Sequence, residues 1–314
     1  MFNRPGPASM NCIRRTIFLF GCLQLTLLSS ITVCSAQQQN KTGADSLTPS
    51  QQKALELLNI VDSTEVSSYW PNIKPSLFFS NIRNNILHPL TINQGKNTNF
   101  CSYAALTHLL IKYQPDSYTE MILSLYFTGN TKLYSKRVIK PSERVRKSAG
   151  TLRHNGEMNI HHADQLWFLS MADSFKGYLN FFNRKYKIGD ENNFWASTNY
   201  SKFNKMLREF GGYKVNAIGS DLLRPWKKDI YGYMSEQLNS GLVMIYINNK
   251  LMYPHNLSFF KMPVPTHFAV LYEVNNSGDG YQLKYWDYGL KTELFLTKKR
   301  LKKTIYGVST ITKR

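Results

Sequence analysis

The spacing of the apolar residues changes near Gly211 and Gly212, and this change constrains the fold more than any other feature of the chain. Before it, apolar residues recur at helical spacing over about 51–61 and repeatedly over about 116–210. After it, we predict one more helix and then strands, from short runs rich in β-branched and aromatic residues. The helix covers about 225–239 and the strands cover 242–247, 267–274, 281–287, 292–296 and 305–311. Helices followed by an antiparallel sheet indicate an α+β fold.

The first 36 residues have the pattern of a secretory signal peptide. Three arginines and no acidic residue accompany a largely apolar run over 16–33, and the segment closes with Cys34-Ser35-Ala36. We predict cleavage after Ala36. An uncleaved anchor is one alternative, because the 18 residues of the run approach the shortest membrane span. A lipoprotein attached through Cys34 is the other.

Residues 37–50 consist largely of Gln, Asn, Thr, Ser and Gly, which predicts a disordered linker. Neither an internal repeat nor a tandem motif follows, so residues 51–314 are expected to form one domain. We therefore expect an exported protein, located in the periplasm or secreted.

Export changes the meaning of the four cysteines. Cys12, Cys22 and Cys34 lie in the predicted signal segment, so the mature chain keeps only Cys101. Exported proteins normally use cysteine in disulfides. An unpaired thiol therefore indicates either a reactive group or a buried side chain that serves as a small apolar residue.

The sequence around Cys101 favours the reactive alternative. Asn97, Thr98 or Asn99 is expected to cap a helix whose apolar residues over 105–110 face the core. Cys101 then lies in or just before the first turn, where backbone N–H groups and the helix dipole stabilise a thiolate. A cysteine at a helix start is thus well placed to act as a nucleophile.

A cysteine nucleophile needs a base, and His267 is the best candidate. His267 begins one predicted strand, and Asp287 ends the next. If the two strands pair through the Asn- and Gly-rich loop at 275–280, antiparallel geometry brings these two positions together. Asp287 is therefore predicted to orient the imidazole of His267.

The other histidines fit this role less well. His108 follows Cys101 by seven residues, about 10 Å along a helix, which exceeds hydrogen-bond reach; it is expected to be packed or half exposed. His161 and His162, with Asp164 nearby, are alternative metal ligands, although adjacent histidines on a helix diverge. Three further histidines are alternative bases: His88, His154 and His255. We predict no metal and no cofactor.

Acyl transfer also needs hydrogen-bond donors for the oxyanion. The backbone N–H of Cys101 is one, and Gln94, seven residues upstream, is the predicted side-chain donor. The alternative role of Gln94 is that of a turn residue beside Gly95.

The ordered set Gln94, Cys101, His267 and Asp287 resembles the papain-like cysteine peptidases, and most closely their bacteriocin-processing, double-glycine type. The resemblance is carried by residues 100–106, 237–247, 266–271 and 286–289. It implies a helical N-terminal lobe whose nucleophile helix packs on a C-terminal antiparallel sheet, and cleavage of an amide through a thioester. Two departures bear on the oxyanion donor and the substrate range. Gln94 lies one residue further from the cysteine than in papain, and Phe100-Cys101-Ser102 replaces the Asp-Cys-Gly common in closer relatives.

The chain is strongly basic. Its formal net charge is +19, and the three arginines of the signal segment leave +16 for the remainder. This charge favours anionic surroundings such as a cell-wall polymer, a lipid surface or an acidic substrate. Two clusters of basic residues are expected to be either solvated faces or a binding site for a polyanion or an anionic lipid. They are residues 298–303, and Lys136, Arg137, Lys140, Arg144, Arg146 and Lys147. Nucleic acid is not expected for an exported protein.

These observations predict an exported cysteine peptidase or amidase that cleaves a peptide or isopeptide bond with a Cys-His-Asp triad. One alternative is an amidase of peptidoglycan stem peptides. The other is a catalytically degenerate papain-like binding module with a basic surface. The expected substrate is a peptide, a protein or a cell-wall peptide, an anionic envelope surface is a further partner, and the expected state is a monomer.

Overall fold

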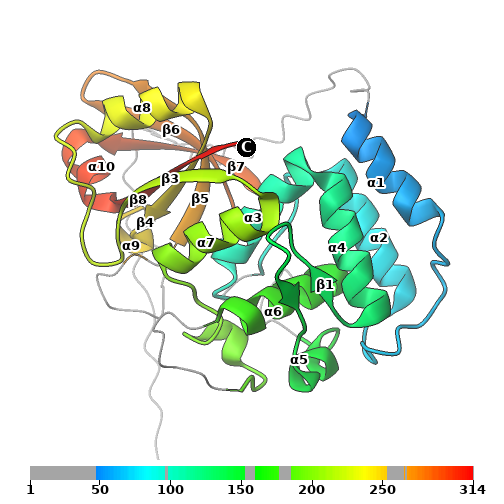
Figure 1. Ribbon diagram of the computed structural model, residues 1–314. Coiled ribbons are helices and arrows are strands. Elements are labelled where there is room, and N and C mark those ends of the chain that lie inside the picture. The colour runs from blue at the N-terminus through cyan, green and yellow to red at the C-terminus, as the bar shows by residue number, and fades with distance from the viewer. Residues whose placement is uncertain are drawn as a thin grey trace, which may run out of the picture. The chain divides into compact units, whose positions relative to one another are not determined.

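In the described part of the chain, helices come first and an antiparallel sheet follows, as the change in periodicity predicts (Figure 1). The structure is a computed structural model that describes residues 47–95, 98–152, 160–176, 185–252, 265 and 267–313. The predicted signal segment and the linker up to residue 46 lie outside these residues. The α+β class is confirmed. Within the described ranges, no helix is both long enough and apolar enough to cross a membrane.

The helices of the first part begin close to where their apolar pattern begins. They are α1 (Pro49–Asn59), α2 (Pro75–Leu87), α3 (Cys101–Tyr113), α4 (Pro115–Thr128), α5 (Glu143–Ser148), α6 (His162–Phe175) and α7 (Tyr200–Gly211), with a 3-10 turn at Asp190–Asn192. Proline at the first turn starts α1, α2 and α4, where its missing N–H costs no helical hydrogen bond. A small two-stranded ladder lies between α4 and α5, formed by β1 (Thr131–Lys132) and β2 (Val138–Ile139).

The second part contains a six-stranded sheet in the order β3-β8-β4-β5-β6-β7, and every neighbouring pair is antiparallel. The strands are β3 (Lys214–Gly219), β4 (Leu242–Ile247), β5 (His267–Asn276), β6 (Gly280–Asp287), β7 (Leu290–Thr297) and β8 (Ile305–Thr312). All five predicted strands are present. The sequence analysis did not predict β3, an edge strand in which no residue is fully buried.

Three further helices accompany the sheet: α8 (Ile230–Ser240), α9 (Asn249–Met252) and α10 (Lys298–Thr304). The helix predicted from about 225 begins five residues later, because Asp229 supplies the N-cap and accepts a hydrogen bond from the Gly232 N–H at 2.9 Å.

Alternate residues of the strands contribute to two separate cores. Met244 and Tyr246 of β4 belong to the large core shared with the N-terminal helices, whereas Val243 and Ile245 belong to a smaller core with α8 and α10. The same alternation holds in β5 and β8. The sheet is therefore buried on both faces, which explains why its central strands are almost continuously apolar.

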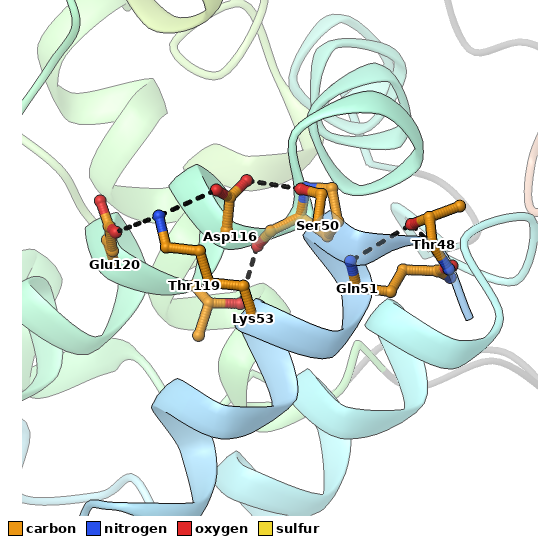
Figure 2. Close-up of polar contacts among 8 residues, drawn as sticks. Thr48, Ser50, Gln51, Lys53, Asp116, Thr119 and Glu120 are labelled. Carbon is orange, nitrogen blue, oxygen red and sulfur yellow. Dashed lines mark hydrogen bonds and ion pairs between the residues drawn. The ribbon is translucent and has the colours of Figure 1, made fainter.

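Polar contacts fix α1 against α4 (Figure 2). Ser50 donates a hydrogen bond to Asp116 at 2.6 Å, and the Lys53 ammonium lies 3.2 Å from the same carboxylate and 3.5 Å from Glu120. Thr48 caps α1 and forms a capping box with Gln51. The last residues of the predicted linker are therefore already part of the helical structure.

A buried carboxylate joins α2 to α6. Asp164 accepts hydrogen bonds from Asn85 at 2.8 Å and Asn81 at 3.3 Å, and its own backbone N–H donates to Asn81 at 3.1 Å. Burial raises the pKa of Asp164 to about 6, although the two asparagines and the nearby His161 oppose this effect. Asp164 thus has a structural role between two helices.

Candidate active site

Cys101 is the first residue of α3, and its side chain is 7% exposed. The rest of α3 up to Ile111 is buried, and the helix contacts β5 as well as α2, α4, α6 and α7. The fold therefore places the start of a central helix next to the sheet, as the sequence predicted for the thiol.

The predicted cap of this helix is wrong for Thr98 and Asn99, and Asn97 lies outside the described residues. The N-cap is Phe100, which provides no side-chain hydrogen bond. The Thr98 hydroxyl instead donates to the Gln94 carbonyl at 2.7 Å, and the Asn99 N–H donates to the Glu191 carbonyl at 2.8 Å. These residues shape the segment before α3 and do not cap it.

His267 and Asp287 lie together, as predicted. The His267 Nε2 and the Asp287 Oδ1 are 2.6 Å apart, and the two side chains are 3% and 2% exposed. The pairing of β5 with β6 explains this contact, because Val270 lies opposite Trp286, the residue before Asp287. The end of β6 is thereby brought to the beginning of β5.

The electrostatic setting of His267 favours a charged ring. Burial lowers the pKa of His267, but the charges of Asp287 and Tyr288 and hydrogen bonds with Asp287 and Cys101 raise it, and the net result is well above the usual value. Because Nε2 faces the carboxylate, Nδ1 is the ring nitrogen that remains for the Cys101 thiol. A protonated imidazole beside a cysteine is the setting in which sulfur reacts as a thiolate.

Tyr288 is a site residue that the sequence analysis quoted within a motif but gave no role. Its ring stacks on that of His267, with centroids 4.8 Å apart and an interplanar angle of 16°. Its hydroxyl accepts a hydrogen bond from the Asn249 side chain at 3.3 Å. The sequence signal for this role was the pair Tyr288-Gly289 between two predicted strands, because such a pair forms a two-residue hairpin turn next to Asp287.

This turn holds Tyr288 in an unusual conformation. Tyr288 has φ 47° and Gly289 has φ 79°, so both central residues of the hairpin are left-handed, as a type I′ turn requires. A large non-glycine residue incurs a steric cost at positive φ, and such residues cluster at functional sites. Here the conformation places the phenol ring over the imidazole.

The segment before α3 is attached to the same hairpin. Trp286 Nε1 donates to the Leu90 carbonyl at 2.9 Å, and Asn93 Nδ2 donates to the Tyr288 carbonyl at 3.2 Å. Gly289 packs so closely here that a Cβ would lie 3.2 Å from the Ile92 carbonyl oxygen. The chain that leads to Cys101 is therefore fixed to the turn that follows Asp287.

Gln94 belongs to this segment and is 3% exposed. Its backbone carbonyl accepts the Thr98 hydrogen bond, whereas its carboxamide makes no hydrogen bond to any residue that the structure describes. Asn99 offers a second donor that the sequence analysis considered only as a cap. Its Nδ2 is buried and has no hydrogen-bond partner within the described ranges, two residues before Cys101.

His108 is buried and has a structural role. Its Nδ1 lies 2.8 Å from the Pro89 carbonyl, its Nε2 lies 2.6 Å from the Tyr272 hydroxyl, and its ring stacks on Trp286 at 4.5 Å. Burial lowers its pKa to about 3, against the effect of the Pro89 hydrogen bond. A neutral ring that donates from Nδ1 and accepts at Nε2 satisfies both partners.

The remaining histidines lie away from this cluster or outside the described residues. His88 ends α2 on the surface, His161 is the exposed N-cap of α6, and His162 accepts the Lys74 N–H at 3.1 Å. His154, His255 and most of the loop at 250–265 are not described. Among the residues that are described, no group of three or more His, Cys, Asp or Glu side chains is arranged to hold a metal ion.

Comparison with protein-family models, with curated proteins and with solved structures finds no match for this chain.

Replacing Asp287 with asparagine should allow the effect of burial, which lowers the pKa of His267, to outweigh the interactions that raise it. The new carboxamide can still accept the Nε2 hydrogen bond, but the negative charge that opposes burial is lost. We expect the pKa of His267 to fall from its raised value to the ordinary range or below it. NMR titration of protein labelled in its histidine rings measures this shift.

The matched control is Asp279→Asn, which changes an exposed carboxylate in the β5–β6 loop of the same hairpin. Equal His267 titrations in parent and Asp287→Asn protein would contradict the proposed coupling.

Proposed function

We propose that this protein is an exported cysteine hydrolase of the papain-like type that cleaves a peptide or isopeptide bond. Cys101 is the nucleophile, His267 the acid and base, and Asp287 the group that orients His267. The observation that carries the proposal is the 2.6 Å contact between two buried side chains, His267 and Asp287, together with the hydrogen bond between His267 and Cys101.

In the proposed reaction the Cys101 thiolate attacks the carbonyl carbon of the scissile amide. As the resulting tetrahedral intermediate collapses, the His267 imidazolium donates its proton to the leaving amine, which gives a free amine and a thioester. Water then attacks the thioester while His267 takes one of its protons. The carboxylic acid leaves, and the sulfur regains its starting state.

Two side chains, Asp287 and Tyr288, support this chemistry by positioning His267. Asp287 fixes the ring so that Nδ1 faces the sulfur, and it stabilises the imidazolium. Tyr288 covers one face of the ring and limits its rotation. Tyr288 is therefore proposed as a positioning residue, because it contacts His267 and is not assigned a contact with the substrate.

The low exposure of the site favours one kind of substrate. Cys101 is 7% exposed and His267 3%, so a folded protein surface does not reach the sulfur directly. An extended peptide or a flexible tail fits such access better. The basic character of the chain also favours a cell-wall stem peptide, because wall polymers are anionic.

Cleavage itself is the first test. The parent protein is incubated with an unfolded protein and, separately, with purified sacculi, and new amino termini or released fragments are identified by mass spectrometry. We expect cleavage by the parent protein and by Asp279→Asn, and none by Cys101→Ala. New termini from the unfolded protein indicate a peptidase, and fragments from sacculi alone indicate a stem-peptide amidase. Cleavage that persists in Cys101→Ala, or its absence from both substrates with the parent, would refute the proposal.

Gln94 and Asn99 provide a test of the oxyanion donor. If the Gln94 carboxamide donates to the oxyanion, Gln94→Ala should lower kcat by roughly a hundredfold or more with little change in KM, because the contact forms only in the transition state. Asn99→Ala, the comparison variant, should change kcat little. The unfolding midpoints of both variants exclude a general loss of structure. A large fall in kcat for Asn99→Ala alone would transfer the donor role to Asn99.

A further inference from the structure

The loop between β3 and α8 displays three large apolar side chains to solvent. Leu222 is 80% exposed, Leu223 is 74% exposed and Trp226 is 100% exposed. The chain has five tryptophans, and the other four are at most 5% exposed: Trp70, Trp167, Trp195 and Trp286. Three such side chains within five residues form an apolar patch, which is typical of an interaction surface.

Hydrogen bonds hold this loop in a defined shape. The Ser220 hydroxyl oxygen accepts from the backbone N–H groups of Leu222 at 3.3 Å and Leu223 at 2.8 Å. The Ser220 N–H donates to the Leu223 carbonyl at 3.0 Å. The two leucines are thus presented by an ordered turn.

Arg224 attaches the loop to the region of α10. Its Nε donates to the Lys303 carbonyl at 2.9 Å, and its guanidinium donates to the Tyr306 hydroxyl at 2.9 Å while lying 4.6 Å from the centre of the Tyr306 ring. Figure 1 shows the loop that leads into α8 beside α10. The exposed apolar residues and the basic helix α10 therefore belong to one surface.

The charge of this surface has a single sign. Residues 222–228 and 298–304 contain eight basic residues and no acidic one: Arg224, Lys227, Lys228, Lys298, Lys299, Arg300, Lys302 and Lys303. The two aspartates that flank the loop have other partners. Asp221 accepts from the Tyr200 N–H and the Tyr246 hydroxyl, each at 2.9 Å, and Asp229 caps α8.

We infer that the surface formed by residues 222–228 and 298–304 binds an anionic phospholipid bilayer. Trp226, Leu222 and Leu223 enter the interfacial layer, and the surrounding lysines and arginines contact lipid phosphates. A dissolved polyanion would satisfy the charges but would leave the apolar side chains in water. A bilayer satisfies both, because its interface combines anionic headgroups with an apolar phase.

Trp226 provides a direct readout, because the other tryptophans are buried. Full-length protein is mixed with phosphatidylglycerol/phosphatidylcholine vesicles that carry bromine, a fluorescence quencher, on their acyl chains. We expect the vesicles to quench part of the tryptophan emission, and Trp226→Phe to abolish this quenching. The apolar run at 16–33 contains no tryptophan. Association through that run alone would leave the emission unchanged.

Charge-reversal variants test the electrostatic part. Lys227→Glu combined with Lys228→Glu should weaken association with these vesicles by about thirtyfold or more, because two cations are lost and an anionic membrane repels the two new carboxylates. The matched pair Lys74→Glu and Lys132→Glu, two exposed lysines outside both basic clusters, should change it little. If the vesicles leave the Trp226 emission unchanged, the inference is overturned, even when the vesicles are found to bind the protein. Equal weakening by both pairs of variants would also overturn it.

Discussion

The hydrogen bond between His267 and Asp287 is the interaction on which the proposed chemistry depends. Both side chains are nearly excluded from water, so neither is stable there as an isolated charge. Their pairing raises the pKa of His267 against the effect of burial, and the carboxylate occupies the Nε2 atom of the ring. A ring held in this way directs its other nitrogen at Cys101. Without the Asp287 carboxylate, the His267 ring would lose the largest of the interactions that oppose the effect of burial on its pKa.

The architecture around this pair converts two distant parts of the sequence into one rigid support. His108, on the same helix as Cys101, stacks on Trp286 and hydrogen-bonds to Tyr272, so α3 is joined to β5 and to the residue that precedes Asp287 in β6. Trp286 and Asn93 attach the segment before α3 to the hairpin that contains Tyr288. Movement of Cys101 relative to His267 would require several of these contacts to break together. Such support is what a preorganised site needs.

Periodicity and strand order were sufficient to predict the class of fold, five of the six strands of the large sheet and the meeting of His267 with Asp287. These features depend on patterns that a sequence displays directly, namely spacing of apolar residues and the geometry of a hairpin. The prediction of the α3 cap was wrong because Thr98 makes a turn contact and Asn99 a tertiary contact, and these contacts compete with capping. Tyr288 was missed as a partner of His267 because its place over the ring depends on its left-handed backbone, which a sequence does not display. The edge strand β3 was missed because an edge needs no fully apolar face.

Cys101 is only 7% exposed, yet it is proposed to attack a substrate. The proposed chemistry therefore depends on whether this sulfur atom is both accessible and reactive. The most direct measurement is the rate constant of Cys101 alkylation by iodoacetamide as a function of pH, in parent and His267→Ala proteins. An imidazolium beside the sulfur predicts rapid alkylation of the parent across neutral pH, whereas His267→Ala should react far more slowly over the same range. Identical pH profiles in the two proteins, or no alkylation of the folded parent, would contradict the assignment of Cys101 as a nucleophile activated by His267.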